Sequence, residues 1–316
     1  MDGADGRPDS VSIDALVQRI GGGPSLHTLT VAEARAASLA RRQLIATGRE
    51  AVALVRDLVL PLPGGDTRAR LYAPREGAPV LLYLHGGGWV IGGLDSSDAL
   101  CRPLANRSGC SIVSLDYPLA PEHPYPAASE AAYAAALWLA AHGRTIGVDQ
   151  DRLAVGGSSA GGNLSAAVAL MARDRVGPPL RLQLVLFPPM DATIRTAPPR
   201  AMPLLTRDEM NWFWDHYLGS AQDPTAAYAS PLRADVSGVA PALVVTAEFD
   251  VLREEGDAYA AKLRDAGVAV WHRSYPTMVH GFLGLAAELP EADDALYELA
   301  RELRSALDGD PPVDPR

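Results

Sequence analysis

Short apolar runs alternate with amphipathic stretches along most of the chain. Six runs have the length and composition of buried strands: Val80–Leu84, Ser111–Leu115, Leu153–Val155, Leu182–Phe187, Ala242–Thr246 and Val268–Tyr275. Apolar positions recur at helical spacing in four other stretches: Ala127–Ala141, Ala160–Arg173, Glu255–Ala266 and Glu291–Leu307. This alternation predicts an α/β protein whose central sheet is mostly parallel and flanked by helices.

The chain before Val80 has a different pattern. One predicted helix lies before the glycines at 21–23 and places four apolar residues on one face: Ile13, Leu16, Val17 and Ile20. A second predicted helix begins at Thr30, where Glu33 completes a capping box. The segment 55–74 has Gly-Gly-Asp between two strand-like runs, which predicts an antiparallel hairpin.

The alternation is interrupted again between Phe187 and Ala242. This stretch contains a predicted helix from about Arg207 to Leu218, preceded by the capping pair Thr206 and Glu209. We expect this helix and the N-terminal helices to form a cap over the strand ends. The expected division is N-terminal cap helices in 1–50, an α/β core in 51–190 and 229–308, a cap insertion in 191–228, and a disordered tail in 309–316.

Composition narrows the class of protein. The formal net charge is −10 and the pI is about 5.2, which argues against a nucleic-acid partner. No uncharged apolar run reaches the roughly 18–20 residues that a membrane span needs, and the N-terminus lacks the pattern of a signal peptide. Cys101 and Cys110 have neither disulfide-framework nor metal-ligand spacing. We therefore expect a cytoplasmic protein with no stable membrane insertion and no metal.

The strongest local signal is Gly157-Ser158-Ser159-Ala160-Gly161. It follows a predicted strand and opens a predicted helix, the setting of a G-x-S-x-G nucleophile elbow. The serine midway between the glycines occupies a strained turn that lifts its hydroxyl above the sheet, and the glycines avoid a clash with neighbouring backbone. Ser159 is therefore the predicted nucleophile. Ser158 is not midway between the glycines.

A second glycine-rich segment, His85-Gly86-Gly87-Gly88-Trp89, directly follows the strand at Val80–Leu84. A P-loop is excluded because no Gly-Lys-Ser/Thr follows, and the spacing of a dinucleotide-binding loop is absent. Glycines here leave backbone N–H groups free to point into open space. Together with the N–H of Ala160, they would form an oxyanion hole.

A serine nucleophile needs a base, and the base needs a carboxylate to orient it. Of the seven histidines, only His280 closely follows the last predicted strand. Three aspartates follow predicted strands, and the chain order Ser…Asp…His excludes Asp116. Asp250 follows the strand before the one that leads to His280, so it is the favoured acid. Asp191 remains the alternative.

With these motifs in place, the chain resembles the hormone-sensitive-lipase-like (family IV) esterases of the α/β-hydrolase superfamily. The resemblance rests on six ordered blocks: HGGGW at 85–89, DYPLAPEHPYPA at 116–127, GSSAGGNL at 157–164, SPLRAD at 230–235, EFDVLREEG at 248–256 and VHGF at 279–282. It implies an α/β-hydrolase fold with a helical cap, a triad of Ser159, Asp250 and His280, and an oxyanion hole of Gly87, Gly88 and Ala160 with Gly86 as hinge. It also implies short- to medium-chain ester substrates, no cofactor, and a homodimer as one candidate assembly.

Three positions depart from the family pattern. Ser158 stands where Asp or Thr is usual, Pro118 where Arg is usual, and Val251 where Pro is usual. None of these departures removes a catalytic group, but each changes hydrogen bonding near the site. The resemblance therefore defines the triad better than it defines the substrate.

The expected activity is carboxylic ester hydrolysis on a small-molecule ester. Two alternatives remain open: hydrolysis of amide, carbamate or lactone bonds by the same triad, and a non-catalytic ligand receptor on the same fold. Trp89, Trp212 and Phe213, with Trp214 beside them, are candidates to line the substrate pocket, although core packing is the more common role of a tryptophan on an amphipathic helix. No Arg or Lys is clearly placed to receive a charged acyl group, so we expect uncharged substrates.

Overall fold

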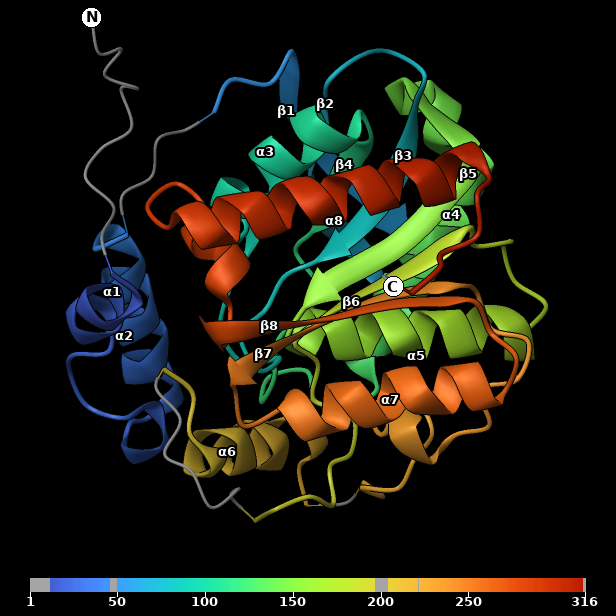
Figure 1. The fold of residues 1–316 in the computed structure, drawn as a ribbon. Helices are drawn as coiled ribbons and strands as arrows, with labels where there is room; N and C mark the ends of the chain where they lie inside the picture. The colour runs from blue at the N-terminus through green and yellow to red at the C-terminus, as the bar shows by residue number, and fades with distance from the viewer. Residues whose placement is uncertain (1–11, 46–49, 197–203, 221, 315–316) are drawn as a thin grey trace, which may run out of the picture.

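The computed structural model describes residues 12–45, 50–196, 204–220 and 222–314. Within these residues a single eight-stranded sheet has the order β1-β2-β4-β3-β5-β6-β7-β8 (Figure 1). β2 is antiparallel to β1 and to β4, and the remaining neighbours are parallel. The strands are β1 (Leu54–Leu62), β2 (Gly65–Ala73), β3 (Ala78–Leu84), β4 (Ser111–Leu115), β5 (Val148–Ser158), β6 (Leu182–Leu186), β7 (Ala242–Phe249) and β8 (Val270–Val279).

All six predicted strands and the predicted hairpin are present, which confirms the predicted fold class. Four strands, β3, β5, β7 and β8, extend beyond their predicted bounds, β5 and β8 the furthest. β5 begins at Val148 rather than Leu153; residues 149–152 are polar, and the register with β3 shifts between Pro79 and Val80. β8 continues four residues past Tyr275, through the exposed Pro276 and Thr277 to the buried Met278 and Val279. Polar or exposed residues interrupt the apolar pattern in both strands, so the parts beyond them were not predicted.

Helices cover both faces of the sheet. α4, α5 and α7 pack on one face, and α3 and α8 pack on the other (Figure 1). The helices are α1 (Ile13–Ile20), α2 (Val31–Gln43), α3 (Asp98–Ser108), α4 (Ala127–His142), α5 (Ala160–Asp174), α6 (Arg207–Leu218), α7 (Arg253–Asp265) and α8 (Pro290–Asp308). This layering buries the sheet on both sides, as the near-continuous apolar runs of its inner strands require.

The sequence pattern did not predict α3. This helix has Pro103 in its interior, and proline lacks the N–H that continues the helical hydrogen bonds. Its buried apolar residues, Leu100, Cys101 and Leu104, nevertheless pack against the sheet. Tertiary burial therefore stabilises a helix that local propensity disfavours.

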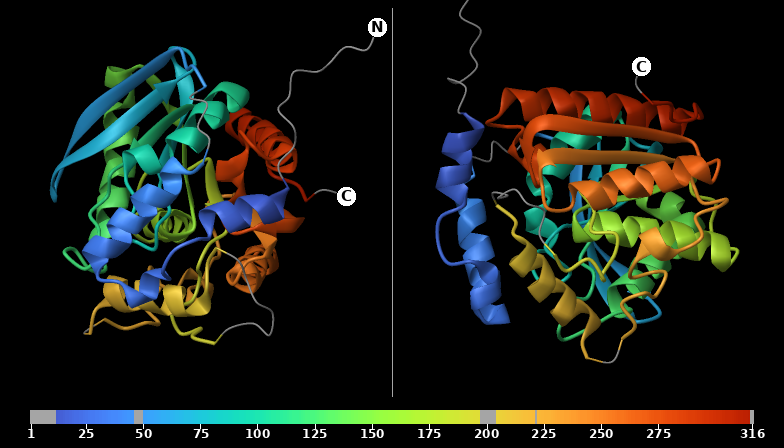
Figure 2. Two further views of the ribbon diagram at one scale, coloured as in Figure 1. Left: turned by 90° about the vertical axis from the view of Figure 1, so that its left-hand side faces the viewer. Right: turned by 60° about the horizontal axis from the view of Figure 1, so that its bottom comes forward.

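The cap consists of α1, α2 and α6, which lie beside the carboxyl ends of the parallel strands (Figure 2). The predicted capping boxes are present at both expected helix starts, where Thr30 pairs with Glu33 and Thr206 pairs with Glu209. The Glu209 carboxylate also accepts hydrogen bonds from the Ser25 hydroxyl and the Leu26 amide, at 2.9 and 3.0 Å. The two parts of the cap are thus joined to each other.

The described part of the C-terminal segment differs from the predicted disordered tail. After α8, Asp314 forms an ion pair with Arg264 of α7 and accepts a hydrogen bond from the His272 amide of β8 at 2.8 Å. Residues 315–316 lie outside the described residues. Asp314 thus connects the end of the described chain to α7 and β8. Over the described ranges, no helix has the length and apolar character to cross a membrane.

Candidate active site

The three predicted catalytic residues follow three strands of the sheet. Ser159 follows β5, Asp250 follows β7 and His280 follows β8. Because β5 to β8 are consecutive parallel neighbours, their carboxyl ends share one edge. The register pairs Phe249 with Val279, which places the following residues, Asp250 and His280, side by side.

Asp250 and His280 form a direct hydrogen bond. The Asp250 Oδ2 lies 2.7 Å from the His280 Nδ1, and Asp250 is only 3% exposed. The other carboxylate oxygen accepts the Leu252 amide at 2.9 Å. A carboxylate at Nδ1 holds the imidazole proton there and leaves Nε2 as the basic nitrogen. Asp191, the alternative acid, bonds Arg233 and Thr193 instead.

The turn at Ser159 has the geometry predicted for a nucleophile elbow. Ser159 has φ 54° and ψ −121°, a conformation that a residue other than glycine rarely adopts. The Ser159 amide donates to the Leu186 carbonyl at 2.7 Å, and the Ser159 carbonyl accepts from Gly162 at 2.8 Å. A Cβ at Gly157 or at Gly161 would overlap the carbonyl oxygen of Leu84. The strained turn is therefore possible only with glycine at both positions.

The loop after β3 runs beside this turn. A Cβ at Gly86 would lie 3.5 Å from the Cβ of Ser159. Gly87 and Gly88 have φ of 124° and 56°, in the region that favours glycine. Among the residues that the structure describes, the amides of Gly87, Gly88 and Ala160 donate no hydrogen bond. Three unpaired donors beside a serine form a suitable site for a developing oxyanion.

His85 supports this loop rather than taking part in proton transfer. Its ring is buried, stacks on Tyr117 with ring centroids 4.1 Å apart, and has Nδ1 2.8 Å from the Gly86 carbonyl oxygen. Burial lowers the pKa of His85 to about 4, so the ring is neutral at physiological pH. The Tyr117 hydroxyl also donates to the His85 carbonyl, at 2.7 Å.

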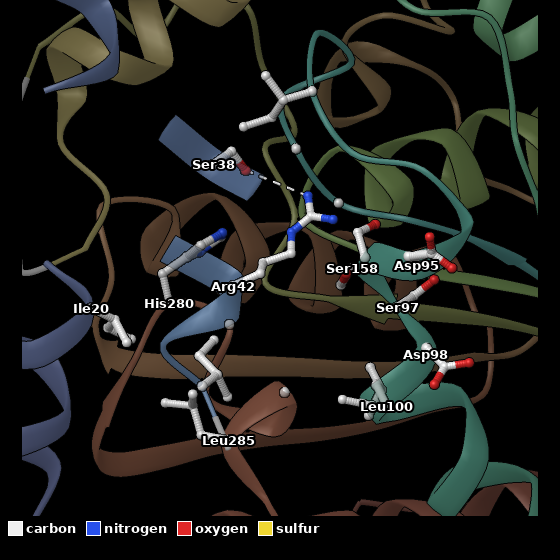
Figure 3. Close-up of a pocket in the computed structure, with 18 of the residues that line it drawn as sticks. Ile20, Ser38, Arg42, Asp95, Ser97, Asp98, Leu100, Ser158, His280 and Leu285 are labelled. Atoms are coloured by element: carbon white, nitrogen blue, oxygen red, sulfur yellow. Dashed lines mark hydrogen bonds between the residues drawn. The ribbon is translucent and has the colours of Figure 1, made fainter. Parts of the chain in front are cut away.

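A cavity of about 480 Å³ opens beside His280 and the glycine loop (Figure 3). Gly86, Gly87, Ser158 and His280 form its inner wall. The cap closes the opposite side and contributes mainly apolar side chains: Ile20, Leu39, Ile45 and Leu204. Sequence reasoning missed these cap residues, because the helical pattern shows which face of a helix is apolar and not what that face covers.

The predicted pocket aromatics do not line this cavity. Trp89 is fully buried, with its ring centroid 4.3 Å from those of both Trp214 and Tyr217. Trp212 packs against the same core cluster. Phe213 lies against Gly88, where a Cβ would overlap its ring. Phe213 therefore packs directly behind the glycine loop, and none of the three aromatics is among the described residues that line this cavity.

Two of the three family departures take part in contacts near the site. The Ser158 hydroxyl accepts a hydrogen bond from the buried Tyr83 at 3.1 Å. The carbonyl of Val251, in the loop of the catalytic acid, accepts from Arg207 of α6 at 2.6 Å. The structure gives no specific contact that explains Pro118.

Arg207 belongs to a buried network under the acid loop. It forms an ion pair with Glu255 at 3.2 Å, and both side chains are at most 5% exposed. The Glu255 carboxylate also accepts the amides of Met190 and Asp191, at 2.7 and 3.1 Å. Burial outweighs these favourable contacts and raises the pKa of Glu255 to about 7. This network connects the cap to the segment that carries Asp250.

Comparison with known proteins places this geometry in a family. Residues 81–284, more than half of the chain, match the family model described as alpha/beta hydrolase fold. The chain belongs to the α/β-hydrolases, in their hormone-sensitive-lipase-like branch. Within the described residues, the eight-stranded, mostly parallel sheet with flanking helices agrees with that assignment.

Several relatives of this α/β-hydrolase are named as esterases. The carboxylic ester hydrolase LipN of Mycobacterium tuberculosis is 46% identical over 73% of this chain and 65% of its own length. An ethyl acetate hydrolase of Pseudomonas putida is 37% identical over 89% of this chain and 92% of its own length. A solved thermostable esterase from Pseudomonas putida has a TM-score of 0.86 at 38% identity, covering 96% of this chain and 99% of that one. The protein is an ester hydrolase of the α/β-hydrolase class.

Proposed function

We propose that the protein hydrolyses carboxylic esters of short- to medium-chain acids in two steps through an acyl-enzyme on Ser159. His280 accepts the Ser159 proton through Nε2 while the hydroxyl oxygen attacks the ester carbonyl. The amides of Gly87, Gly88 and Ala160 stabilise the oxyanion. His280 returns the proton to the departing alcohol, and water then repeats the sequence on the acyl-enzyme.

The hydrogen bond between Asp250 and His280, at 2.7 Å, is the observation that carries this proposal. It supports the orientation of a base at the same strand edge as a serine in a strained turn. A ligand receptor on this fold would have no need of a buried carboxylate that holds one nitrogen of an imidazole. The three unpaired amides beside Ser159 support acyl transfer over binding alone.

The direct test is Ser159→Ala with p-nitrophenyl butyrate as substrate. We expect kcat to fall by about 10⁴-fold or more with an unchanged circular dichroism spectrum, because no other group can form the acyl-enzyme. A fluorophosphonate should label the wild type and Ser158→Ala, but not Ser159→Ala. Retention of more than a tenth of wild-type activity in Ser159→Ala would contradict the proposal.

The proposed acyl length rests on the size of the cavity. A space of about 480 Å³ lies in the lower half of the range of small-molecule pockets, which favours esters of short or medium length. Across p-nitrophenyl esters from acetate to laurate, we expect kcat/KM to be highest at a short or medium length. A maximum at laurate would contradict this part of the proposal.

A further inference from the structure

Among the described residues of the cap, one basic side chain lines the cavity, together with His280. Arg42 of α2 lines the same cavity as Gly86, Gly87 and His280. In Figure 3 its guanidinium extends inward, and in that view it lies between His280 and Ser158. A substrate with its ester carbonyl at Ser159 would therefore place another part of itself within reach of this cation.

The acidic residues of the cavity wall already have partners, whereas Arg42 has almost none. Asp98 bonds Tyr72 and Arg102, and Asp95 bonds Arg70 at 2.7 Å. Within the described ranges, no carboxylate pairs with the Arg42 guanidinium. Its one hydrogen bond there goes to the Ser38 hydroxyl at 3.4 Å. A guanidinium has five N–H donors in a planar fork, so most of its capacity is unused.

This guanidinium is also partly removed from water. Burial lowers the pKa of Arg42 from its ordinary value, and the attraction of Asp95 does not fully compensate. A half-buried charge without a close counter-ion carries a desolvation cost that an anionic ligand would offset. The remaining lining from the cap is mainly apolar, so a fitting ligand would combine an apolar body with one anionic group.

The fold holds α2 so that Arg42 faces the cavity. Arg35 lies seven residues earlier, two turns away on the same helix face. Its guanidinium donates to the carbonyls of Val90 and Ala120, at 2.9 and 3.1 Å, and pairs with Glu122. These contacts attach α2 to the segment after the glycine loop. The direction of Arg42 therefore follows from the docking of the helix.

We propose that Arg42 binds a carboxylate on the substrate, so that the preferred substrates are esters that also carry a carboxylate group. The planar guanidinium suits bidentate hydrogen bonding to a carboxylate. This inference rests on the proposed ester hydrolysis and names the substrate class. It reverses the expectation of uncharged substrates drawn from the sequence.

The test compares two matched pairs of substrates, each an acid and its neutral amide. Monomethyl adipate and methyl adipamate place the charge on the acyl side, and acetoxybutyrate and acetoxybutyramide place it on the alcohol side. For each pair we measure the ratio of kcat/KM for the acid to that for the amide. In the wild type we expect one pair to give a ratio above about ten, since hydrogen bonds between charged groups are among the strongest in proteins.

Arg42→Gln should lower that ratio by about ten- to a hundredfold, mainly through a higher KM for the acid, because the carboxylate contact forms before the chemical step. Arg42→Lys should restore part of it, since charge is kept without the planar fork. Arg41→Gln, which removes the same charge from the neighbouring position, is the matched control and should keep the wild-type ratio.

Three results would overturn the inference: a wild-type ratio at or below one for both pairs, an unchanged ratio in Arg42→Gln, or an equal fall in Arg41→Gln. These outcomes are separate from a failure of the proposed function. If the wild type cleaved the ester bond of neither the neutral substrates nor p-nitrophenyl butyrate, the proposed ester hydrolysis itself would be contradicted.

Discussion

The two walls of the active-site cavity are held in place in different ways. On the core wall, Ser159, Asp250 and His280 follow hydrogen-bonded parallel strands. In the cap, where α2 contributes to the opposite wall, α2 and α6 are attached largely through side chains, with Arg35 on one helix and Arg207 on the other. The strand ends of the core wall position the groups that carry out the chemical steps. On the cap wall, substitution of a few side chains can change the contacts to the substrate without moving those groups. Catalysis and substrate choice therefore rest on different parts of the fold.

The largest expected effect follows from a change on the core wall. Asp250→Asn should lower kcat for p-nitrophenyl butyrate by about 10⁴-fold, because an amide holds the imidazole in the wrong tautomer. The unfolding midpoint should change little, since the amide keeps the carboxylate's shape. Steady-state kinetics and thermal unfolding check both expectations.

Asp191→Asn is the matched control, because Asp191 is a buried carboxylate that bonds Arg233 rather than His280. It should retain kcat within a few-fold of the wild type. If both variants lost kcat to a similar extent, Asp250 would have no more effect on catalysis than a buried carboxylate that does not contact His280.

A change in the network that connects the walls should have an intermediate effect. Arg207→Met leaves Glu255 buried without its cation and should lower the free energy of unfolding by about 3–5 kcal/mol. The pKa of Glu255 is raised to about 7 in the fold, and loss of Arg207 raises it further. A raised carboxyl pKa means that stability is present at low pH and lost as pH rises from about 4.5 through 7. The deficit should therefore be larger at pH 8 than at pH 5.

Urea unfolding of both proteins at the two pH values measures this deficit. Adding Glu255→Gln to Arg207→Met should recover part of the stability and remove most of the pH dependence, because the buried group is then neutral. A deficit below about 1 kcal/mol, or one that is equal at both pH values, would show that the pair does not hold the walls together.

The smallest expected effect concerns the anchor of α2. Glu122→Gln removes the partner of Arg35, and because Glu122 is about half exposed the loss should be under about 1 kcal/mol. Hydrogen bonds from Arg35 lower the pKa of Glu122 to about 2. A lowered carboxyl pKa gives stability above about pH 4.5 that is lost as pH falls towards 2.

The difference in melting temperature between wild type and Glu122→Gln should accordingly be small at pH 7 and should disappear near pH 2. A loss of several kcal/mol in the free energy of unfolding of Glu122→Gln at pH 7 would mean that the cap depends on this contact more than its exposure indicates. A melting-temperature difference that increases as the pH falls would contradict the lowered pKa of Glu122, which predicts a decrease.

The sequence alone was sufficient for the parts of the molecule that depend on local sterics and on strand order. Gly157 and Gly161 are required because a side chain at either position would overlap the backbone of Leu84. This requirement appears in the chain as a short motif around Ser159. The order of buried strands then placed Asp250 and His280 at one edge, because parallel neighbours end together.

The tertiary structure alone decided which side chains surround the substrate. Trp89 and Arg42 were both visible in the chain, yet the tryptophan packs behind the glycine loop and the arginine extends into the cavity. Asp314 likewise contacts partners about forty or fifty residues earlier in the chain. Local pattern specifies an element and its apolar face. What a side chain meets depends on how distant elements dock, which is determined by packing across the whole fold.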